Sequence, residues 1–123
     1  MQQQLRTDLT AAMRARDAVA VAALRSALAA IGNAEAVPVV PDGGATSSSE
    51  HVAGARVGLG AAEAPRRALS ADDVAALVRA EATERGAAAE QMAALGRPEV
   101  AERLRAEAAV LARYLPPQRN AAR

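Results

Sequence analysis

Residue types that commonly do chemistry in proteins are few in this 123-residue chain. The single histidine, His51, lies in the stretch "SSSEHVAG". A catalytic base must be held in fixed geometry, and we expect residues 41–54 to be disordered, so His51 is not expected to be catalytic. Serines 47–49 have no base to activate them. The absence of cysteine excludes thiolate catalysis and zinc–thiolate sites.

Carboxylate pairs occur at helical spacing in two places, Glu81/Glu84 and Glu99/Glu102. Because no histidine lies nearby, we expect these carboxylates to pair with neighbouring arginines on solvated helix faces rather than to hold a metal. The glycines of "GARVGLG", residues 54–60, match no phosphate-binding motif. The sequence therefore predicts no catalytic residue, no metal and no cofactor.

Two arginine features leave alternatives open. Arg66 and Arg67 precede an expected helix start, where backbone N–H groups favour anions, so they are either an anion site or solvated loop residues. Arg85 falls close to the apolar stripe of an expected helix, where an unpaired arginine is costly. It either pairs with a carboxylate such as Glu35 or Glu107, or with terminal helix carbonyls, or it binds a ligand.

Composition sets the fold class that must position these residues. Alanine, the strongest helix former, is by far the commonest residue, and there is no Phe or Trp. The large apolar side chains are too few for a thick core, so the helices must approach closely, which small side chains permit. We predict an all-α, four-helix bundle-like domain with a long irregular loop between the second and third helices.

The first two helices follow from apolar spacing. The first is expected over 3–16, with Leu5, Leu9, Ala12 and Met13 on one face, and Asp17 ends it and caps the next helix. The second helix continues through Gly32 towards Pro38. Its packing seam is predicted to consist of Val21, Leu24, Leu28 and Ile31.

Residues 37–69, rich in proline, glycine and serine, form the predicted loop. Ser70 and Asp73 resemble a capping box that starts the third helix. Its apolar line is expected to run to Leu95, and Gly96 ends it. Pro98 begins the fourth helix, whose apolar line runs from Val100 to Leu115 until Pro116 stops it.

Charge and hydropathy limit the kinds of partner that we expect for this protein. The formal net charge is +1, and all fifteen basic residues are arginine, with no basic patch visible along the sequence. No apolar run is expected to approach the 18–20 residues, roughly, of a membrane span. The start "MQQQLRTDL" does not resemble a signal peptide. We therefore expect a cytoplasmic protein that does not contact a membrane.

Three stretches together resemble the YqeY-like proteins of the GatB/YqeY family: "LRSALAAIGNAEAV", "LSADDVAALVRAEATER" and "LGRPEVAERLRAEAAVLARYLPPQ". The resemblance spans nearly the whole chain except the 38–62 loop. The glycine-arginine turn followed by Tyr-Leu-Pro is its most specific part. The matching positions are Leu24, Arg25, Asn33, Glu35, Arg85, Gly96, Arg97, Glu107, Leu111, Tyr114, Leu115 and Pro116.

The resemblance implies an N-terminal helical domain followed by a small helical C-terminal domain. That second domain resembles the tRNA-recognising tail of the B subunit of a tRNA-dependent amidotransferase, a carbon–nitrogen ligase with glutamine as amido-N-donor. By this resemblance, residues 1–115 form the YqeY-like N-terminal domain, and Tyr114 closes its bundle. Residues 116–123 are a linker stub, and the C-terminal domain is expected to be missing.

Three functions follow as hypotheses. The first is a non-catalytic module associated with tRNA or an amidotransferase–tRNA complex, in which the RNA-binding residues are Arg14, Arg16, Arg25, Arg66 and Arg67. The alternative is a protein–protein interaction adaptor without RNA binding, with the 38–62 loop as a contact. The third is a glutamine-dependent amidotransferase in its own right, which the lack of cysteine and of a Ser–Lys constellation argues against.

Overall fold

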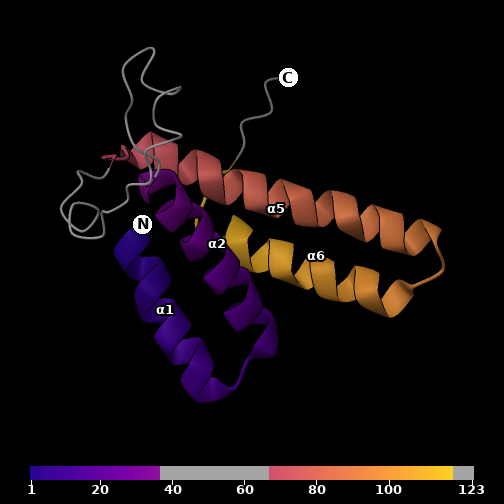
Figure 1. The fold of residues 1–123 in the computed structure, drawn as a ribbon. Helices are drawn as coiled ribbons and strands as arrows, with labels where there is room; N and C mark the ends of the chain where they lie inside the picture. The colour runs from indigo at the N-terminus through magenta and orange to yellow at the C-terminus, as the bar shows by residue number, and fades with distance from the viewer. Residues whose placement is uncertain (37–66, 118–123) are drawn as a thin grey trace, which may run out of the picture. The chain divides into compact units, whose positions relative to one another are not determined.

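The chain is all-helical in the part that the computed structural model describes, residues 1–36 and 67–117, where no strand occurs. Figure 1 shows the four helices, which are α1 (Gln2–Ala15), α2 (Ala18–Ala36), α5 (Ala71–Ala94) and α6 (Pro98–Ala112). The predicted fold class and helix number are thus confirmed. The predicted loop lies almost entirely outside the described residues, as does its expected disorder. By its contacts the chain divides into two units, Met1–Ile31 with Ser70–Arg123, and Gly32–Leu69.

The turn between α1 and α2 depends on Arg16 and Asp17. Arg16 has φ 57° and ψ 39°, the left-handed conformation. Its N–H donates to the Met13 carbonyl at 3.2 Å, and the Asp17 N–H donates to the Ala12 carbonyl at 3.0 Å, so the last carbonyls of α1 are satisfied. The Asp17 carboxylate then accepts from the Ala20 N–H at 3.1 Å. The predicted role of Asp17 as the cap of the second helix is confirmed.

The boundaries of α5 also follow the sequence. Ser70 Oγ accepts from the Asp73 N–H and Asp73 Oδ2 accepts from the Ser70 N–H, both at 3.0 Å, so the capping box is present. At the other end Gly96 has φ 77°, a conformation open to glycine. The Arg97 N–H then reaches back to the Met92 carbonyl at 2.8 Å. Pro98 begins α6, as predicted.

The core of the first unit, Met1–Ile31 with Ser70–Arg123, is small and rich in alanine. Its largest fully buried side chains are Leu5, Leu24, Ile31, Val78 and Leu111. The buried hydrophobic residues around them are alanines and valines, namely Ala12, Ala23, Ala27, Val74, Ala89, Ala101 and Val110. Such side chains fill little volume, so close helix approach is what makes this core dense.

The predicted seam of α2 is half wrong. Leu24 and Ile31 are buried, but Val21 and Leu28 are only partly buried, while Ala23 and Ala27 are fully buried. Alanines thus share the buried face of α2 with Leu24 and Ile31, and Val21 and Leu28 lie beside that face, where they keep some exposure.

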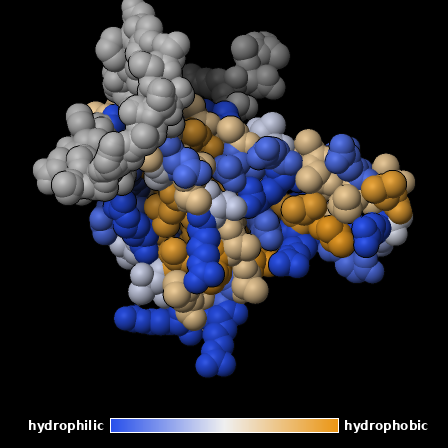
Figure 2. All heavy atoms as spheres, in the orientation of Figure 1, coloured by the Kyte–Doolittle hydropathy of each residue, from blue (hydrophilic) through white to orange (hydrophobic). Residues whose placement is uncertain are grey.

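The apolar line of α5 ends earlier than predicted, and that of α6 begins later. Leu95 is 67% exposed and Val100 38% exposed. Figure 2 shows hydrophobic atoms on the surface at the turn between these helices. Met13, predicted on the inner face of the first helix, is also exposed, at 48%. These positions continue the helical spacing of the core, but no described element covers them, so periodicity alone overestimated the core.

By length and composition alone, α2 is the one helix in the described ranges that could cross a membrane. The expectation that no segment approaches the length of a membrane span is therefore wrong for this helix. A core helix of a soluble protein meets the same criteria, and α2 supplies the buried Leu24 and Ile31. One such helix is weak support for a membrane span.

Candidate functional site

Arg85 is the centre of a polar cluster between three helices. From α5, its Nε donates to Glu107 Oε1 of α6 at 3.0 Å, and its Nη2 donates to Ser26 Oγ of α2 at 2.7 Å. Its Nη1 donates to Glu81 Oε1 at 2.9 Å and to the Glu81 carbonyl at 3.3 Å. The guanidinium group is thus committed to the protein's own acceptors, and its part is to join α2, α5 and α6.

Glu107 is the buried anion of this cluster. Its side chain is only 8% exposed, against 14% for that of Arg85. Arg103, which is 62% exposed, approaches the second oxygen of Glu107 at 3.5 Å. A buried charge is tolerated only when it is paired and hydrogen-bonded. Of the carboxylates considered for Arg85 from the sequence, Glu107 is the one bound, together with Glu81 of the same helix.

Tyr114, the only aromatic residue, is bonded to the first helix. Its hydroxyl donates to Asp8 Oδ2, and this bond fastens the segment that follows α6 to α1. Partial burial, the hydrogen bond to Asp8 and the negative charge of Asp8, in that order of size, together raise the pKa of Tyr114 to about 12, although the charge of Arg113 acts in the opposite direction. Sequence reasoning did not identify Asp8 or Ser26, because neither partner is marked by spacing or type.

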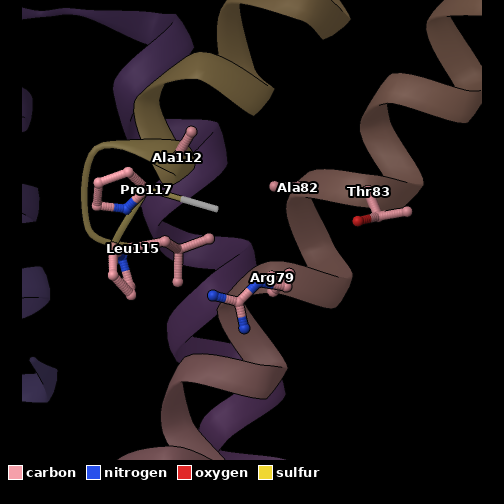
Figure 3. A pocket seen from close by; sticks show the side chains of 7 residues that line it. Arg79, Ala82, Thr83, Ala112, Leu115 and Pro117 are labelled. Carbon is pink, nitrogen blue, oxygen red and sulfur yellow. The ribbon is translucent and has the colours of Figure 1, made fainter. Parts of the chain in front are cut away.

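A cavity of about 300 Å³ lies between α5 and the segment that follows α6. Figure 3 shows Arg79, Ala82 and Thr83 on one wall and Ala112, Leu115 and Pro117 on the other. Pro116 completes the lining. No sequence pattern marked Arg79 as a site residue, because an arginine within a helix such as α5 is common on solvated faces.

The proposed RNA-binding arginines lie in different parts of the chain. Arg14, Arg16 and Arg25 belong to α1, α2 and their turn, and all three are exposed. Figure 2 shows hydrophilic atoms at the turn between these helices. Arg67 is exposed, and its backbone N–H donates to the Glu35 carbonyl at 2.9 Å. Arg66 lies outside the described residues.

The start of α5 is already supplied with negative charge. The capping box occupies two backbone donors, and Asp72 and Asp73 stand in the first turn. Carboxylates there satisfy the positive end of the helix dipole and repel a second anion. The anion site proposed at Arg66 and Arg67 therefore has no support from this helix terminus and stays a prediction.

Other predicted positions are distributed as follows. Within residues 1–36 and 67–117 there is no group of three or more His, Asp or Glu residues that could hold a metal ion. His51 lies outside those ranges. Among the family-matching positions, Leu24, Glu107 and Leu111 are buried. Partly buried positions are Glu35, Arg85, Tyr114 and Leu115, and exposed ones are Arg25, Asn33, Gly96, Arg97 and Pro116.

Comparison with known proteins bears on the second half of the chain. The family model described as Yqey-like protein matches residues 59–123, slightly more than half of the chain. The match includes α5, the glycine-arginine turn, α6 and the Tyr-Leu-Pro segment, whereas the matching positions in α2 lie before it. No curated protein and no solved structure matches the chain. The chain belongs to the YqeY-like protein family.

Proposed function

We propose that this YqeY-like domain is a non-catalytic module that docks on tRNA, or on a complex of tRNA with an amidotransferase, through Arg14, Arg16 and Arg25. Arg66 and Arg67 are secondary candidates in this proposal. The observation that carries it is the difference between the bases and acids of α1 and α2. The acids have hydrogen-bond partners, whereas the arginine side chains have none among the residues that the structure describes.

The acids of these helices are engaged in the fold. Asp8 accepts from Gln4 Nε2 at 3.0 Å and also from Tyr114. Asp17 caps α2, and Glu35 also has a partner. In contrast, no side-chain partner occurs among the described residues for any arginine of these helices, namely Arg6, Arg14, Arg16 and Arg25.

Unpaired, exposed guanidinium groups suit a phosphate backbone. Arginine presents a rigid set of donors that can grip a phosphate bidentately, and binding releases the counterions that the RNA had condensed. The net charge of +1 does not oppose this, since local rather than total charge meets the RNA. The lack of aromatic residues other than Tyr114 means that contact would be to phosphates and sugars rather than by base stacking.

The direct test is a titration of fluorescently labelled tRNA with the 123-residue chain at low and at physiological salt. Micromolar or tighter binding that weakens steeply with salt supports the proposal, because counterion release makes affinity fall with salt. Absence of binding at both salt concentrations contradicts it.

A second candidate is a protein-interaction adaptor without RNA binding. It is favoured by the exposed Leu95 and Val100 at the turn between α5 and α6, because exposed apolar side chains are common at protein interfaces. An adaptor would retain a protein partner at moderate salt and show no affinity for tRNA. Changing Leu95→Ser together with Val100→Ser would then release the partner without affecting the fold.

A further inference from the structure

The cavity beside α5 combines a free cation with apolar walls. Arg79 lines it and has no hydrogen bond or ion pair with any described residue. Its side chain extends from α5 towards Leu115 (Figure 3). Further along the same helix, by contrast, the Arg85 guanidinium donates to Glu107, Glu81 and Ser26. Arg79, a partly buried residue, thus has no anionic partner within residues 1–36 and 67–117.

Few hydrogen-bond donors besides Arg79 face the cavity. Among the lining side chains only Thr83 is otherwise polar. Pro116 and Pro117 have no backbone N–H to offer, and the Leu115 N–H is used by the Ala112 carbonyl at 3.1 Å. Leu115, Pro116 and Pro117 therefore offer no free backbone N–H to an anion, and the donors must come from Arg79 and Thr83.

We propose that this cavity binds a small monocarboxylate with a compact aliphatic body. The Arg79 guanidinium holds the carboxylate through two parallel N–H donors, and the Thr83 hydroxyl donates to the same group. Leu115, Pro116 and Pro117 cover the aliphatic part. A single guanidinium group balances one negative charge, which favours a carboxylate over a phosphate dianion.

The size of the cavity limits the ligand. A volume of about 300 Å³ lies at the lower end of ligand-binding cavities, which is enough for a branched acid of a few carbons. The same carboxylate chemistry is present in a free aliphatic acid and at the end of a peptide with an apolar last residue. An experiment with both probes distinguishes these two sources.

The test uses the full chain with isovalerate, its neutral analogue isovaleramide, inorganic phosphate and an acetylated Ala-Val dipeptide with a free carboxylate. Each is titrated against ¹⁵N-labelled protein and followed by backbone amide shifts. Isovalerate is expected to saturate with a dissociation constant on the order of millimolar, and to move the amides of Thr83 and Leu115 but not that of Gly96. Tighter binding of the dipeptide than of isovalerate would assign the site to a peptide end. Equal or weaker binding would assign it to a free acid.

Variants separate the site from general charge effects. Arg79→Gln should weaken the affinity for isovalerate about tenfold, the loss expected for a charge-assisted hydrogen bond. Arg105→Gln makes the same charge change at an exposed position of α6 and should alter this affinity less than about twofold. Ala112→Leu adds side chain to the wall at an exposed position and should abolish binding while the circular dichroism spectrum stays unchanged. Equal binding of isovalerate and isovaleramide, stronger binding of phosphate, or an unaffected Arg79→Gln variant would overturn the proposal.

Discussion

Arg85 of α5 donates from Nε to Glu107 of α6 at 3.0 Å, in a domain whose buried hydrophobic residues include many alanines. The same guanidinium group reaches Ser26 of α2 at 2.7 Å. In a core with so few large side chains, this polar cluster adds a hydrogen-bonded link between α2, α5 and α6. The stability of the fold should therefore depend on it strongly.

Arg85→Ala should lower the free energy of unfolding by about 3 kcal/mol, because it leaves the buried Glu107 carboxylate without its main partner. Urea denaturation followed by helical circular dichroism measures this loss. The matched control is Arg103→Ala, which removes the exposed arginine beside the same carboxylate and should cost less than about 1 kcal/mol. Equal losses from the two variants would mean that the cluster is not buried in solution.

Leu24→Ala and Leu95→Ala compare the same truncation inside and outside the core. Leu24 is 2% exposed and Leu95 is 67% exposed. The first change should cost roughly 2–5 kcal/mol, as a core truncation does, and the second less than about 0.5 kcal/mol. The measurement is again the free energy of unfolding. A large loss from Leu95→Ala would show that the turn between α5 and α6 is covered.

The sequence predicted the local features of the fold well and its side-chain burial less well. Ser70, Asp73, Gly96 and Pro98 act within one turn of the chain, so their type and spacing determine a helix start or end directly. The burial of Ala27 in place of Leu28 depends on how α2 is rotated against its neighbours. Alanine-rich helices offer little hydrophobic contrast to determine that rotation from sequence.

Among the candidate sites, too, local patterns could be predicted from the sequence and long-range contacts could not. Arg85 was identified because an arginine on an apolar stripe requires a partner, and a partner could be named. Asp8 was not identified from the sequence, since its bond with Tyr114 joins residues 106 positions apart. The cavity at Arg79 depends on where the chain passes after α6, which no local pattern determines.

Tyr114 should titrate with a pKa of about 12, well above the usual value of about 10 for tyrosine. Because it is the only aromatic residue, tyrosinate absorbance reports on it alone. Asp8→Asn should lower this pKa part of the way, since burial remains when the carboxylate charge is lost. Asp72→Asn, the same change on an exposed residue of α5, should leave it unaltered. A native pKa near 10 would contradict the bond to Asp8.

The raised pKa of Tyr114 also predicts how the stability of the fold varies at alkaline pH. The folded state holds the phenolic proton more tightly than the unfolded state, so it binds more protons between about pH 10 and 12. The contribution of Tyr114 to stability should be complete below about pH 10 and decline as the pH rises through about 12. Tyr114→Phe should remove that part of the decline in a series of urea denaturations across this range.

Substituting glycine for Arg16 and for Arg14 should change the free energy of unfolding in opposite directions. Arg16 has positive φ, a conformation that costs a residue with a side chain about 1–2 kcal/mol, so Arg16→Gly should raise the free energy of unfolding by about 0.5–1 kcal/mol. Arg14 lies in the last turn of α1, where Arg14→Gly should lower it by about 0.5–1 kcal/mol. Both changes remove one positive charge, which isolates the backbone effect. A loss of stability from both would show that Arg16 is not left-handed in solution.

The central claim is that the free arginines of α1 and α2 meet the phosphate backbone of tRNA. The most direct measurement compares the salt dependence of tRNA binding for two variants with equal charge, Arg14/Arg16/Arg25→Gln and Arg97/Arg105/Arg113→Gln. The first variant should bind tRNA more weakly than the natural chain. Its slope of log affinity against log salt concentration should be smaller in magnitude by about two, because each phosphate contact contributes somewhat less than one to that slope. The second should keep a slope close to that of the natural chain. Equal slopes for the two variants would contradict the claim.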